Sequence, residues 1–391
     1  MMLKRGAAAA IAPFLVMDVI ARANARQAAL PAGAPGIIHM EVGQPGTGAP
    51  RGAVEAASRA MLAGEPLGYT EAFGRRSLRE AICRHYASFY DGVTVEPGRI
   101  AVTTGASGGF LLAFLSAFDI GDRIAMVSPY YPPYLNILHA LGMVPVVLPA
   151  TEATRFQPTV AMLEQLAEQD GLPDGLIVAS PCNPAGTMLA ATELAVLAQW
   201  CDTHGVRLVS DEIYHGLTWE MPAATAASFS DTAIVINSFS KYWSMTGWRV
   251  GWMVLPLDLV GAAERLKQNM FISAPHVSQV AAEAAFACTA EIAANLSRYR
   301  RSRDFLLQHL PGAGFPSLSP AQGAFYLYAD ISARSGDSLS FANRILDETG
   351  VAVTPGVDFD AGRGQGFLRF SYCGPEDDMR NAPSRLALLA H

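Results

Sequence analysis

Short runs of β-branched residues alternate with helix-like patterns from about Gly43 to about Ala290, and this alternation constrains the fold more than any other feature. It is typical of a parallel sheet, whose strands are buried on both faces and are joined by helices. We therefore predict an α/β fold with a mainly parallel seven-stranded sheet sandwiched by helices. The predicted strands are Ile100–Thr103, Arg123–Val127, Val144–Leu148, Leu176–Ala179, Arg207–Ser210, Ala233–Asn237 and Val250–Val254.

The two ends of the chain have a different pattern. A long helix is predicted over Asn295–Leu310, followed by strands around Ala324–Ala329 and Phe367–Tyr372, which is typical of a smaller α+β unit. We predict a large domain over residues 43–290 and a small domain over 291–391, which residues 1–42 join as an arm and helix.

The N-terminal residues imitate a secretory signal, because Lys4 and Arg5 precede an apolar run. Asp18 interrupts that run, and apolar residues recur at helical spacing from Phe14 to Leu30, which favours an amphipathic helix. A secreted form remains the less favoured alternative.

Composition excludes several classes of function. Of the 391 residues, 51% are hydrophobic and the formal net charge is −7, which argues for a globular protein without a nucleic-acid partner. The five cysteines are scattered and the histidines show no metal-ligand spacing, so we expect reduced thiols in a cytoplasmic protein and no metal site. No apolar stretch reaches the length of a membrane span.

Lys241 lies in the most informative segment, Asn237–Gly251, which follows a predicted strand. A lysine amine with a lowered pKa is a nucleophile that forms a Schiff base with an aldehyde. Ser238, Ser240 and Arg249 suit a phosphate group, which a planar guanidinium binds in bidentate fashion. An aldehyde and a phosphate on one small molecule describe pyridoxal 5′-phosphate. A lone S-x-K would more often be a surface lysine, but the whole segment favours the cofactor.

This segment resembles the pyridoxal-phosphate-dependent aminotransferases of class I and II, the aspartate aminotransferase-like enzymes of fold type I. The resemblance implies that an amino group moves between an amino acid and a 2-oxo acid by a ping-pong mechanism, through a Schiff base on Lys241. Lys241 would also act as general base at the substrate's Cα.

Two further segments after strands fit the same family. Asp211 ends one strand, where a carboxylate would keep the cofactor's pyridine nitrogen protonated, and Tyr214 would donate to its 3-oxygen. Asn183, held between two prolines, is expected at the same oxygen and at the substrate carboxylate. Each motif alone also fits an ordinary cap or turn.

Small residues predict the phosphate site. Gly105, Ala106 and Ser107 precede a helix that is predicted to begin near Phe110, and a helix N-terminus attracts phosphate. Ser238, Ser240 and Arg249 are expected to complete this site.

Two tyrosines complete the expected cofactor contacts. Tyr131 is expected over the pyridine ring, although a core position is an alternative. The resemblance assigns Tyr69 to the phosphate of the neighbouring subunit's cofactor, which implies a homodimer with shared active sites.

Arg369 stands alone in the apolar run Phe367–Ser371, and a buried arginine needs an anionic partner. The resemblance assigns it to the substrate's α-carboxylate, with the Gly43 backbone nearby; an internal salt bridge is the alternative. No second arginine marks a dicarboxylate substrate, and Phe14 and Tyr326 fit a pocket for a neutral or aromatic side chain as well as a core. The sequence does not identify the substrate.

Two rival functions remain open at this stage. A β-eliminating C–S lyase would use the same Lys241 and Arg369, so motifs do not separate it from an aminotransferase. A ligand-sensing regulator would carry an added DNA-binding module, for which we find no room before the helix that starts at Phe14.

Overall fold

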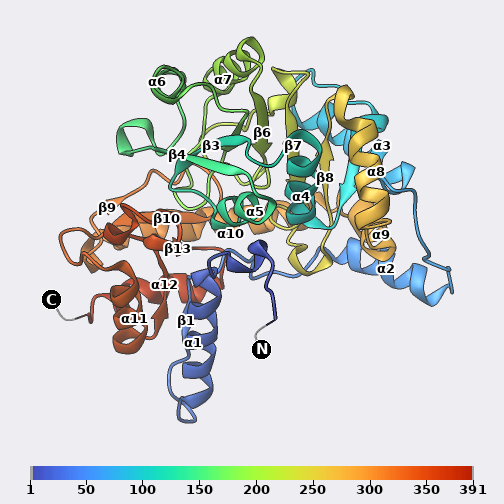
Figure 1. Ribbon diagram of the computed structural model, residues 1–391. Coiled ribbons are helices and arrows are strands. Elements are labelled where there is room, and N and C mark those ends of the chain that lie inside the picture. Colours follow the sequence, from blue (N-terminus) through green and yellow to red (C-terminus); the bar gives the residue numbers. More distant parts are fainter. Residues whose placement is uncertain (1–2, 390–391) are drawn as a thin grey trace.

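The computed structural model describes residues 3–389 and is built around one seven-stranded sheet (Figure 1). Its strand order is β2-β8-β7-β6-β5-β3-β4. The strands are β2 (Ile100–Thr103), β3 (Arg123–Ser128), β4 (Val144–Pro149), β5 (Gly175–Ala179), β6 (Arg207–Asp211), β7 (Ile234–Ser238) and β8 (Gly251–Val254). Each of the seven strands predicted for this sheet is confirmed to within one residue at each end.

The sheet is mainly parallel, as predicted. Only β8 runs against its neighbours, pairing antiparallel with both β7 and β2. In the parallel part, Ala179 lies opposite Asp211 and Asp211 lies opposite Ile236, so β5, β6 and β7 end at the same edge. Residues that follow these strands are therefore brought together.

Helices cover both faces because successive strand residues point to opposite sides. Leu176, Val178 and Leu208 pack under α3 (Arg76–Phe89), α6 (Val160–Asp170), α7 (Ala191–His204) and α9 (His276–Ala285). Ile177 and Val209 pack under α4 (Gly105–Ala117), α5 (Pro132–Leu141) and α8 (Leu257–Met270). Both faces are thus sealed by apolar cores.

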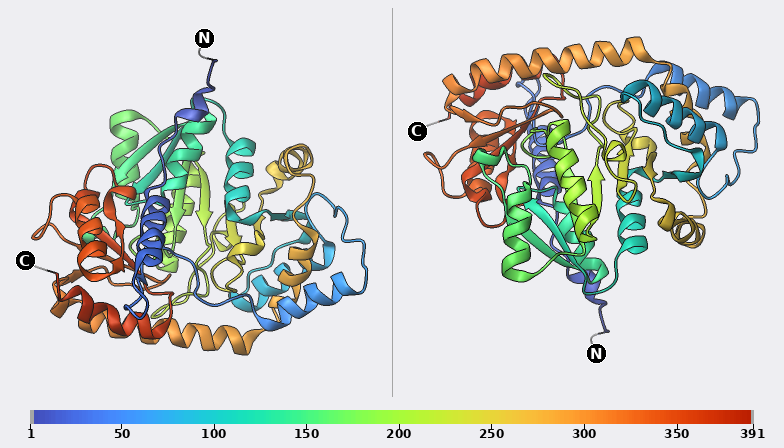
Figure 2. Two further views of the ribbon diagram at one scale, coloured as in Figure 1. Left: turned by 90° about the horizontal axis from the view of Figure 1, so that it is seen from below. Right: turned by 90° about the horizontal axis from the view of Figure 1, so that it is seen from above.

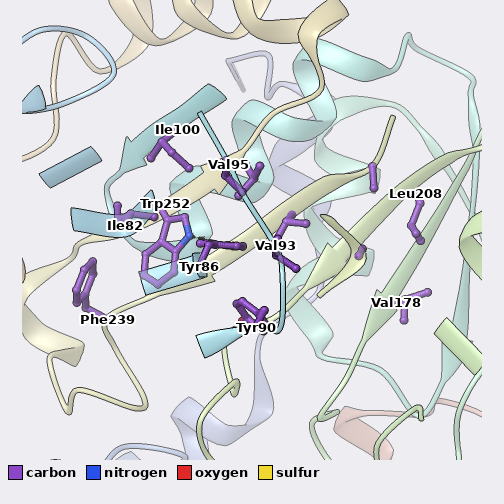
Figure 3. Packing of buried hydrophobic residues seen from close by; sticks show 14 of the residues in the cluster. Ile82, Tyr86, Tyr90, Val93, Val95, Ile100, Val178, Leu208, Phe239 and Trp252 are labelled. Carbon is purple, nitrogen blue, oxygen red and sulfur yellow. Dashed lines mark hydrogen bonds between the residues drawn. The ribbon is translucent and has the colours of Figure 1, made fainter. Parts of the chain in front are cut away.

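Trp252 of β8 packs in the first of these cores, near Ile82 and Tyr86 (Figure 3). It is fully buried, and its indole nitrogen donates to the Tyr86 hydroxyl at 3.3 Å. The ring of Phe239 lies 5.1 Å away, centroid to centroid. A large aromatic body with a satisfied polar atom fixes this end of the sheet.

A second, smaller sheet lies in the C-terminal part. Its antiparallel order is β12-β13-β10-β9, and its strands are β9 (Ser317–Leu318), β10 (Tyr326–Asp330), β12 (Thr354–Pro355) and β13 (Phe367–Ser371). It is flanked by α11 (Ser338–Thr349) and α12 (Glu376–Leu386). This α+β arrangement matches the expectation for that region.

The long helix α10 (Thr289–His309) begins six residues before the predicted start at Asn295. Both views of Figure 2 show it running along one side of the molecule, from the C-terminal helices toward α2 (Arg51–Leu62). This single continuous helix therefore links the region of the small sheet to that of the large sheet.

The N-terminal residues pack on the C-terminal part. Helix α1 (Leu15–Ala29) confirms the predicted amphipathic helix, and its Val19 and Ala23 pack on Leu346 and Ala352. After it, β1 (Ile38–His39) pairs in parallel with β11 (Val351–Ala352).

Among residues 3–389, all five cysteines are free thiols and no group of side chains has the makings of a metal site. In the same part of the chain, no helix combines the length and apolar character of a membrane span.

Candidate active site

A cavity of about 740 Å³ opens at the edge where β5, β6 and β7 end. Most of the predicted site residues line it. They are Gly43, Ala106, Ser107, Tyr131, Asn183, Asp211, Tyr214, Ser240, Lys241, Arg249 and Arg369.

Lys241 lies three residues beyond the end of β7, with its amine inside the cavity. The amine donates to the Gly43 carbonyl at 2.7 Å and lies 5.9 Å from the centre of the Tyr214 ring. Burial lowers the pKa of Lys241 to about 8. A lysine in this state has an appreciable neutral, nucleophilic fraction at neutral pH.

Gly43 approaches the cavity so closely that no side chain fits. A Cβ at this position would overlap the Tyr326 hydroxyl. The absence of a side chain therefore allows the backbone carbonyl to reach the Lys241 amine.

Asp211, the last residue of β6, is buried beside the cavity. It accepts hydrogen bonds from the Ile213 amide at 3.1 Å and from the Tyr134 hydroxyl. Burial raises the pKa of Asp211 to about 6, against the opposing effect of these donors. With its pKa raised in this way, the carboxyl group gains or loses a proton near neutral pH according to the charge of the group that contacts it.

Tyr134 is a site residue that the sequence analysis missed. It stands three positions after Tyr131, on the first turns of α5, so the two rings face the same side. Their centroids are 5.4 Å apart. The helical spacing within the Tyr-rich segment was the available signal.

Arg369 is buried in β13 and faces the cavity with only neutral partners. It donates to the Asn183 side-chain oxygen at 2.8 Å, to the Thr354 hydroxyl at 3.0 Å and to the Glu41 carbonyl. Its Nε has no hydrogen-bond partner. No carboxylate pairs with it within residues 3–389, so the alternative of an internal salt bridge is not found there.

Aromatic rings enclose the guanidinium of Arg369. It lies 4.5 Å from the Tyr326 ring centre and 4.8 Å from that of Phe359. The Tyr326 hydroxyl is in turn 2.7 Å from the Tyr214 hydroxyl. Tyr326, which the sequence left between pocket and core, is thus part of the cavity wall.

The phosphate region differs from the prediction in one respect. The helix predicted to begin near Phe110 begins at Gly105, so Gly105, Ala106 and Ser107 form its first turn. Glycines disfavour helices, and the prediction was wrong because tertiary packing outweighs that preference. Gly105 has a φ of +74°, and a Cβ there would clash with the Arg249 guanidinium.

The two serines near Lys241 occupy different positions. Ser240 lines the cavity, whereas Ser238 lies behind it, fully buried, with its hydroxyl 2.9 Å from that of Ser240. Arg249 donates to the Thr246 carbonyl at 3.0 Å and has no carboxylate partner in the described chain. Ser240, Arg249 and the start of α4 therefore form an electropositive corner.

Tyr131 stands at the cavity wall between two other rings. Its ring is in edge contact with Phe14, 6.0 Å away, as well as with Tyr134. Burial raises the pKa of Tyr131 to about 12, so it is a neutral phenol at physiological pH.

Tyr69 lies outside the cavity. It is 82% exposed, so within one chain it contributes nothing to the site.

Helix α1 supplies a wall that the sequence analysis found only in part. Phe14 was a candidate, but Val16, Met17 and Ile20 line the cavity as well. Ile137 of α5 adds a further apolar surface. The amphipathic pattern of α1 was visible, but its partner in space was not.

Comparison with known proteins agrees with this geometry. Residues 35–386 match the family model of aminotransferases of class I and II. The chain is 47% identical over 382 residues to a valine–pyruvate aminotransferase of Mycobacterium tuberculosis, covering 97% of this chain and 96% of the relative.

Solved structures give the same result. An aminotransferase from Mycobacterium tuberculosis superimposes with a TM-score of 0.94 at 46% identity, covering 99% of this chain and 98% of that one. Aspartate aminotransferase from Thermus thermophilus with maleate gives 0.91 at 29% identity, covering 100% of both chains. The chain therefore belongs to the class I and II aminotransferases, the fold type I enzymes that move an amino group between an amino acid and a 2-oxo acid.

Proposed function

We propose that this aminotransferase holds pyridoxal 5′-phosphate through a Schiff base on Lys241 and takes amino acids with uncharged, apolar side chains as donors. One observation supports this most strongly. The amine of Lys241, the carboxyl of Asp211 and the guanidinium of Arg369 converge on one cavity whose remaining wall is largely apolar.

The residues present fit the cofactor at each of its functional groups. Lys241 offers a partly neutral amine to the aldehyde. The start of α4, with Ala106 and Ser107, and the Ser240 hydroxyl offer donors to the phosphate. Arg249 has no competing carboxylate in the described chain, so its charge is free for the same anion.

The ring of the cofactor has matching partners. Asp211 would hold a proton on the pyridine nitrogen, and Tyr131 would stack on the ring face. Asn183 and Tyr214 would donate to the 3-oxygen, for which Tyr214 would exchange its present bond with Tyr326. When bound, the cofactor supplies an electron sink for the charge left at the substrate's Cα.

Lys241 and Asp211 would have separate roles in the reaction. Lys241, once free of the aldehyde, would act as the general base that takes the proton from the substrate's Cα and would hold that proton for its return. Asp211 keeps the ring nitrogen protonated throughout. Because the amino group is stored between two half-reactions, the kinetics follow a ping-pong scheme.

Arg369 is our candidate for binding the carboxylate common to donor and acceptor. It is held by neutral partners and retains an unpaired Nε. Burying a charged guanidinium costs free energy unless an anion binds to it. The planar arrangement of its N–H donors suits a carboxylate, which accepts two hydrogen bonds side by side. Asn183 and the Gly43 backbone would assist.

The side-chain end of the cavity favours an apolar donor. Among the described residues that line the whole cavity, the cationic ones are Lys241, Arg249 and Arg369, and all three already have roles. The similar valine–pyruvate aminotransferase is named for a branched apolar donor. We therefore propose valine and similar amino acids as donors and pyruvate as an acceptor.

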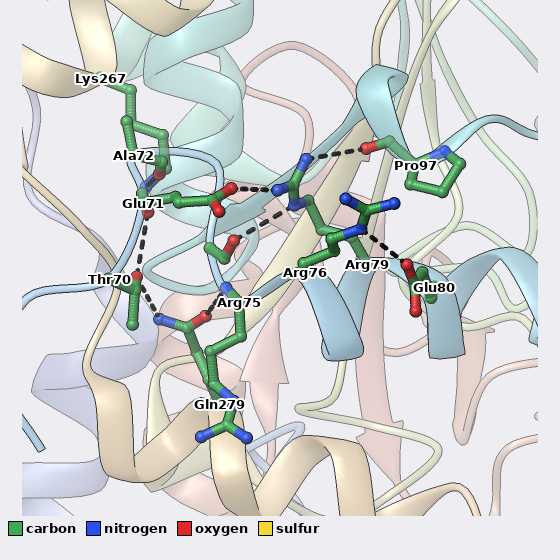
Figure 4. A network of polar contacts seen from close by, with 11 residues as sticks. Thr70, Glu71, Ala72, Arg75, Arg76, Arg79, Glu80, Pro97, Lys267 and Gln279 are labelled. Atoms are coloured by element: carbon green, nitrogen blue, oxygen red, sulfur yellow. Dashed lines mark hydrogen bonds and ion pairs between the residues drawn. The ribbon is translucent and has the colours of Figure 1, made fainter.

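We also propose that the protein is a cytoplasmic homodimer in which Tyr69 reaches the partner's phosphate site. The segment that follows Tyr69 is fixed by polar contacts (Figure 4). Gln279 donates to the Thr70 hydroxyl at 3.1 Å and accepts from the Arg75 amide at 2.8 Å, and Lys267 donates to the Ala72 carbonyl. An exposed tyrosine on such a fixed base is suited to insertion into a neighbour.

Exposed apolar side chains lie near Tyr69 in the sequence. Met61 and Leu62 are 55% and 88% exposed, and far from them in the sequence Met270 at the end of α8 and Ile272 just after it are about half exposed. Their burial against a second copy would remove apolar surface from water.

In the same proposal, residues 43–290 form the large domain, and residues 1–42 and 291–391 form the small domain.

Borohydride reduction tests the cofactor assignment. The chain has three lysines, Lys4, Lys241 and Lys267, so peptide mass spectrometry after reduction identifies the modified one without ambiguity. We expect the label on Lys241, loss of the label and of turnover in Lys241→Ala, and no change in the control Lys4→Ala. A label elsewhere contradicts the assignment.

A half-reaction screen tests the donor class. Adding single amino acids and following the loss of the imine absorbance should rank valine, leucine and alanine above aspartate and glutamate. A preference for dicarboxylic donors would contradict the apolar assignment but would leave the role of Lys241 intact.

Subunit complementation tests the shared site. Lys241→Ala and Tyr69→Ala dimers should each be impaired, and unfolding and refolding them together should recover activity. The hybrid would have one site with both an intact lysine and an intact tyrosine. No recovery in demonstrated hybrids would show that Tyr69 does not cross between subunits.

A further inference from the structure

We propose that α1 is the wall that selects the substrate's side chain, and that Asp358 is the positioning residue that sets this wall in place. The inference rests on the proposed function, because it assumes an apolar donor in the cavity beside Lys241. It adds a residue outside the cavity and a physical basis for selectivity.

The wall consists of Phe14, Val16, Met17 and Ile20, which all face the cavity. Across from them lie Ile137 and the Tyr131 ring, which touches Phe14 by its edge. A substrate held by its carboxylate at Arg369 would present its side chain to whatever apolar surface remains. A branched side chain gains from such contact, whereas alanine offers only one methyl group.

The start of α1 has no cap of its own. Phe14 occupies the N-cap position and has no side-chain oxygen for the first free amides. Asp358 accepts from the amides of Leu15 at 3.1 Å and Val16 at 3.2 Å, from 343 and 342 positions further along the chain. The helix is thus capped by a residue distant in the sequence, and its first turn is fixed to the segment that carries Asp358.

Other contacts attach α1 to the same part of the molecule. Arg22 pairs with Asp347 of α11 at 2.5 Å, and Arg26 donates to the Asp347 carbonyl at 2.7 Å. Figure 1 shows α1 beside α11. These contacts lie in the later turns. In the first turn, Asp358 binds the free amides of Leu15 and Val16, and the ring of Phe14 touches Tyr131.

The segment at Asp358 also touches the carboxylate end of the site. The next residue, Phe359, places its ring 4.8 Å from the Arg369 guanidinium. Its carbonyl accepts from the Tyr130 amide at 3.0 Å, beside Tyr131. One short segment therefore sets the distance between the arginine for the carboxylate and the wall for the side chain.

The test compares donor selectivity in holoenzyme variants. For each we would measure KM and kcat for leucine and alanine with one acceptor, and hydrogen exchange of the amides of residues 15–20. In Asp358→Ala we expect the ratio of KM for leucine to KM for alanine to rise about 3- to 30-fold, as expected for loss of a helix cap. Exchange at residues 15–20 should become faster.

Three further variants sharpen the test. Asp358→Asn keeps one acceptor and should give a smaller change in both readouts. Ile20→Ala shortens the wall without touching the cap, so the KM ratio should rise while exchange stays close to that of the wild type. Asn24→Ala, an exposed position on the same helix, is the matched control and should change neither.

Several outcomes would overturn the inference. Faster exchange with an unchanged KM ratio would show that α1 does not select the side chain. Equal losses for leucine and alanine would show a general role in folding or catalysis. An unchanged exchange rate would show that Asp358 does not position the helix. A wild type that prefers charged donors would instead defeat the proposed substrate class before any variant is compared.

Discussion

The two sides of the cavity are built in different ways. On the side of the large sheet, Asp211 ends one strand, Asn183 and Lys241 follow the ends of its two neighbours, and all three are set by the backbone around them. On the opposite side, α1 lies on the surface and is attached through Asp358, Arg22 and a small apolar contact. The sheet side carries the chemistry that every donor needs, and the helix side carries what distinguishes one donor from another.

This difference has a physical cause. Buried strand ends tolerate little movement, because the interior is close-packed and its polar groups are satisfied. A surface helix held by a few contacts shifts at little cost. Reactions that require fixed geometry are therefore placed on the sheet side, and selectivity is left to the helix.

The largest effect is expected on the sheet side, at Asp211. Asp211→Asn removes the negative charge that would hold the ring proton, so kcat should fall by about 10²–10³-fold while the cofactor stays bound. Steady-state kinetics and the cofactor absorbance of the purified variant would measure the two effects. A fall in kcat of less than tenfold would contradict the conclusion that the sheet side carries the chemistry that every donor needs.

Lys241 should show its environment directly in the cofactor-free protein. With a pKa of about 8 instead of 10.5, its neutral fraction at pH 7 is raised roughly 300-fold. Trace labelling with acetic anhydride, read out by mass spectrometry, should give a rate that rises with pH and levels off above about 8. A rate still rising steeply at pH 9.5 would contradict the lowered pKa.

Arg369 should give a smaller effect that both substrates share. Arg369→Gln loses one net hydrogen bond from a charged donor to the carboxylate, worth about 1.5–3 kcal/mol, so KM should rise about 10- to 150-fold. The increase should be similar for donor and acceptor because both carry the carboxylate. If only one of them is affected, the arginine does not bind their common group.

The smallest effect is expected on the surface of α1. Arg22 and Asp347 are about half exposed, and such pairs contribute about 0.2–1 kcal/mol. A double-mutant cycle with Arg22→Ala and Asp347→Ala, followed by urea unfolding, should give a coupling in this range. The KM ratio of leucine to alanine should change less than twofold, in contrast to Asp358→Ala.

The sequence predicted the sheet side far better than the helix side. All seven strands were located to within one residue, because each is a short apolar run bounded by turn residues; six of them are buried, and the edge strand β4 is partly exposed. The site residues that lie beyond these strands were predicted from the positions of their motifs in the sequence. The start of α4 was misplaced because glycine preference was weighed without the packing of Arg249 against Gly105.

The helix side was not accessible to the same reasoning. The pattern of α1 was predicted, but not its contact with residues more than 300 positions away. Asp358 carries no local signal, since its role as a cap exists only in three dimensions. Met17 and Ile20 could not be told from ordinary core residues until their surroundings were known.

The cap that Asp358 gives to α1 also orders events during protein synthesis. Leu15 is synthesised before its partner Asp358, which follows 343 positions later in the chain. The entropy of closing so long a loop grows only slowly with length, and the large sheet folded in between shortens the remaining gap. The first turn of α1 is therefore capped only after all seven strands of the large sheet have been synthesised.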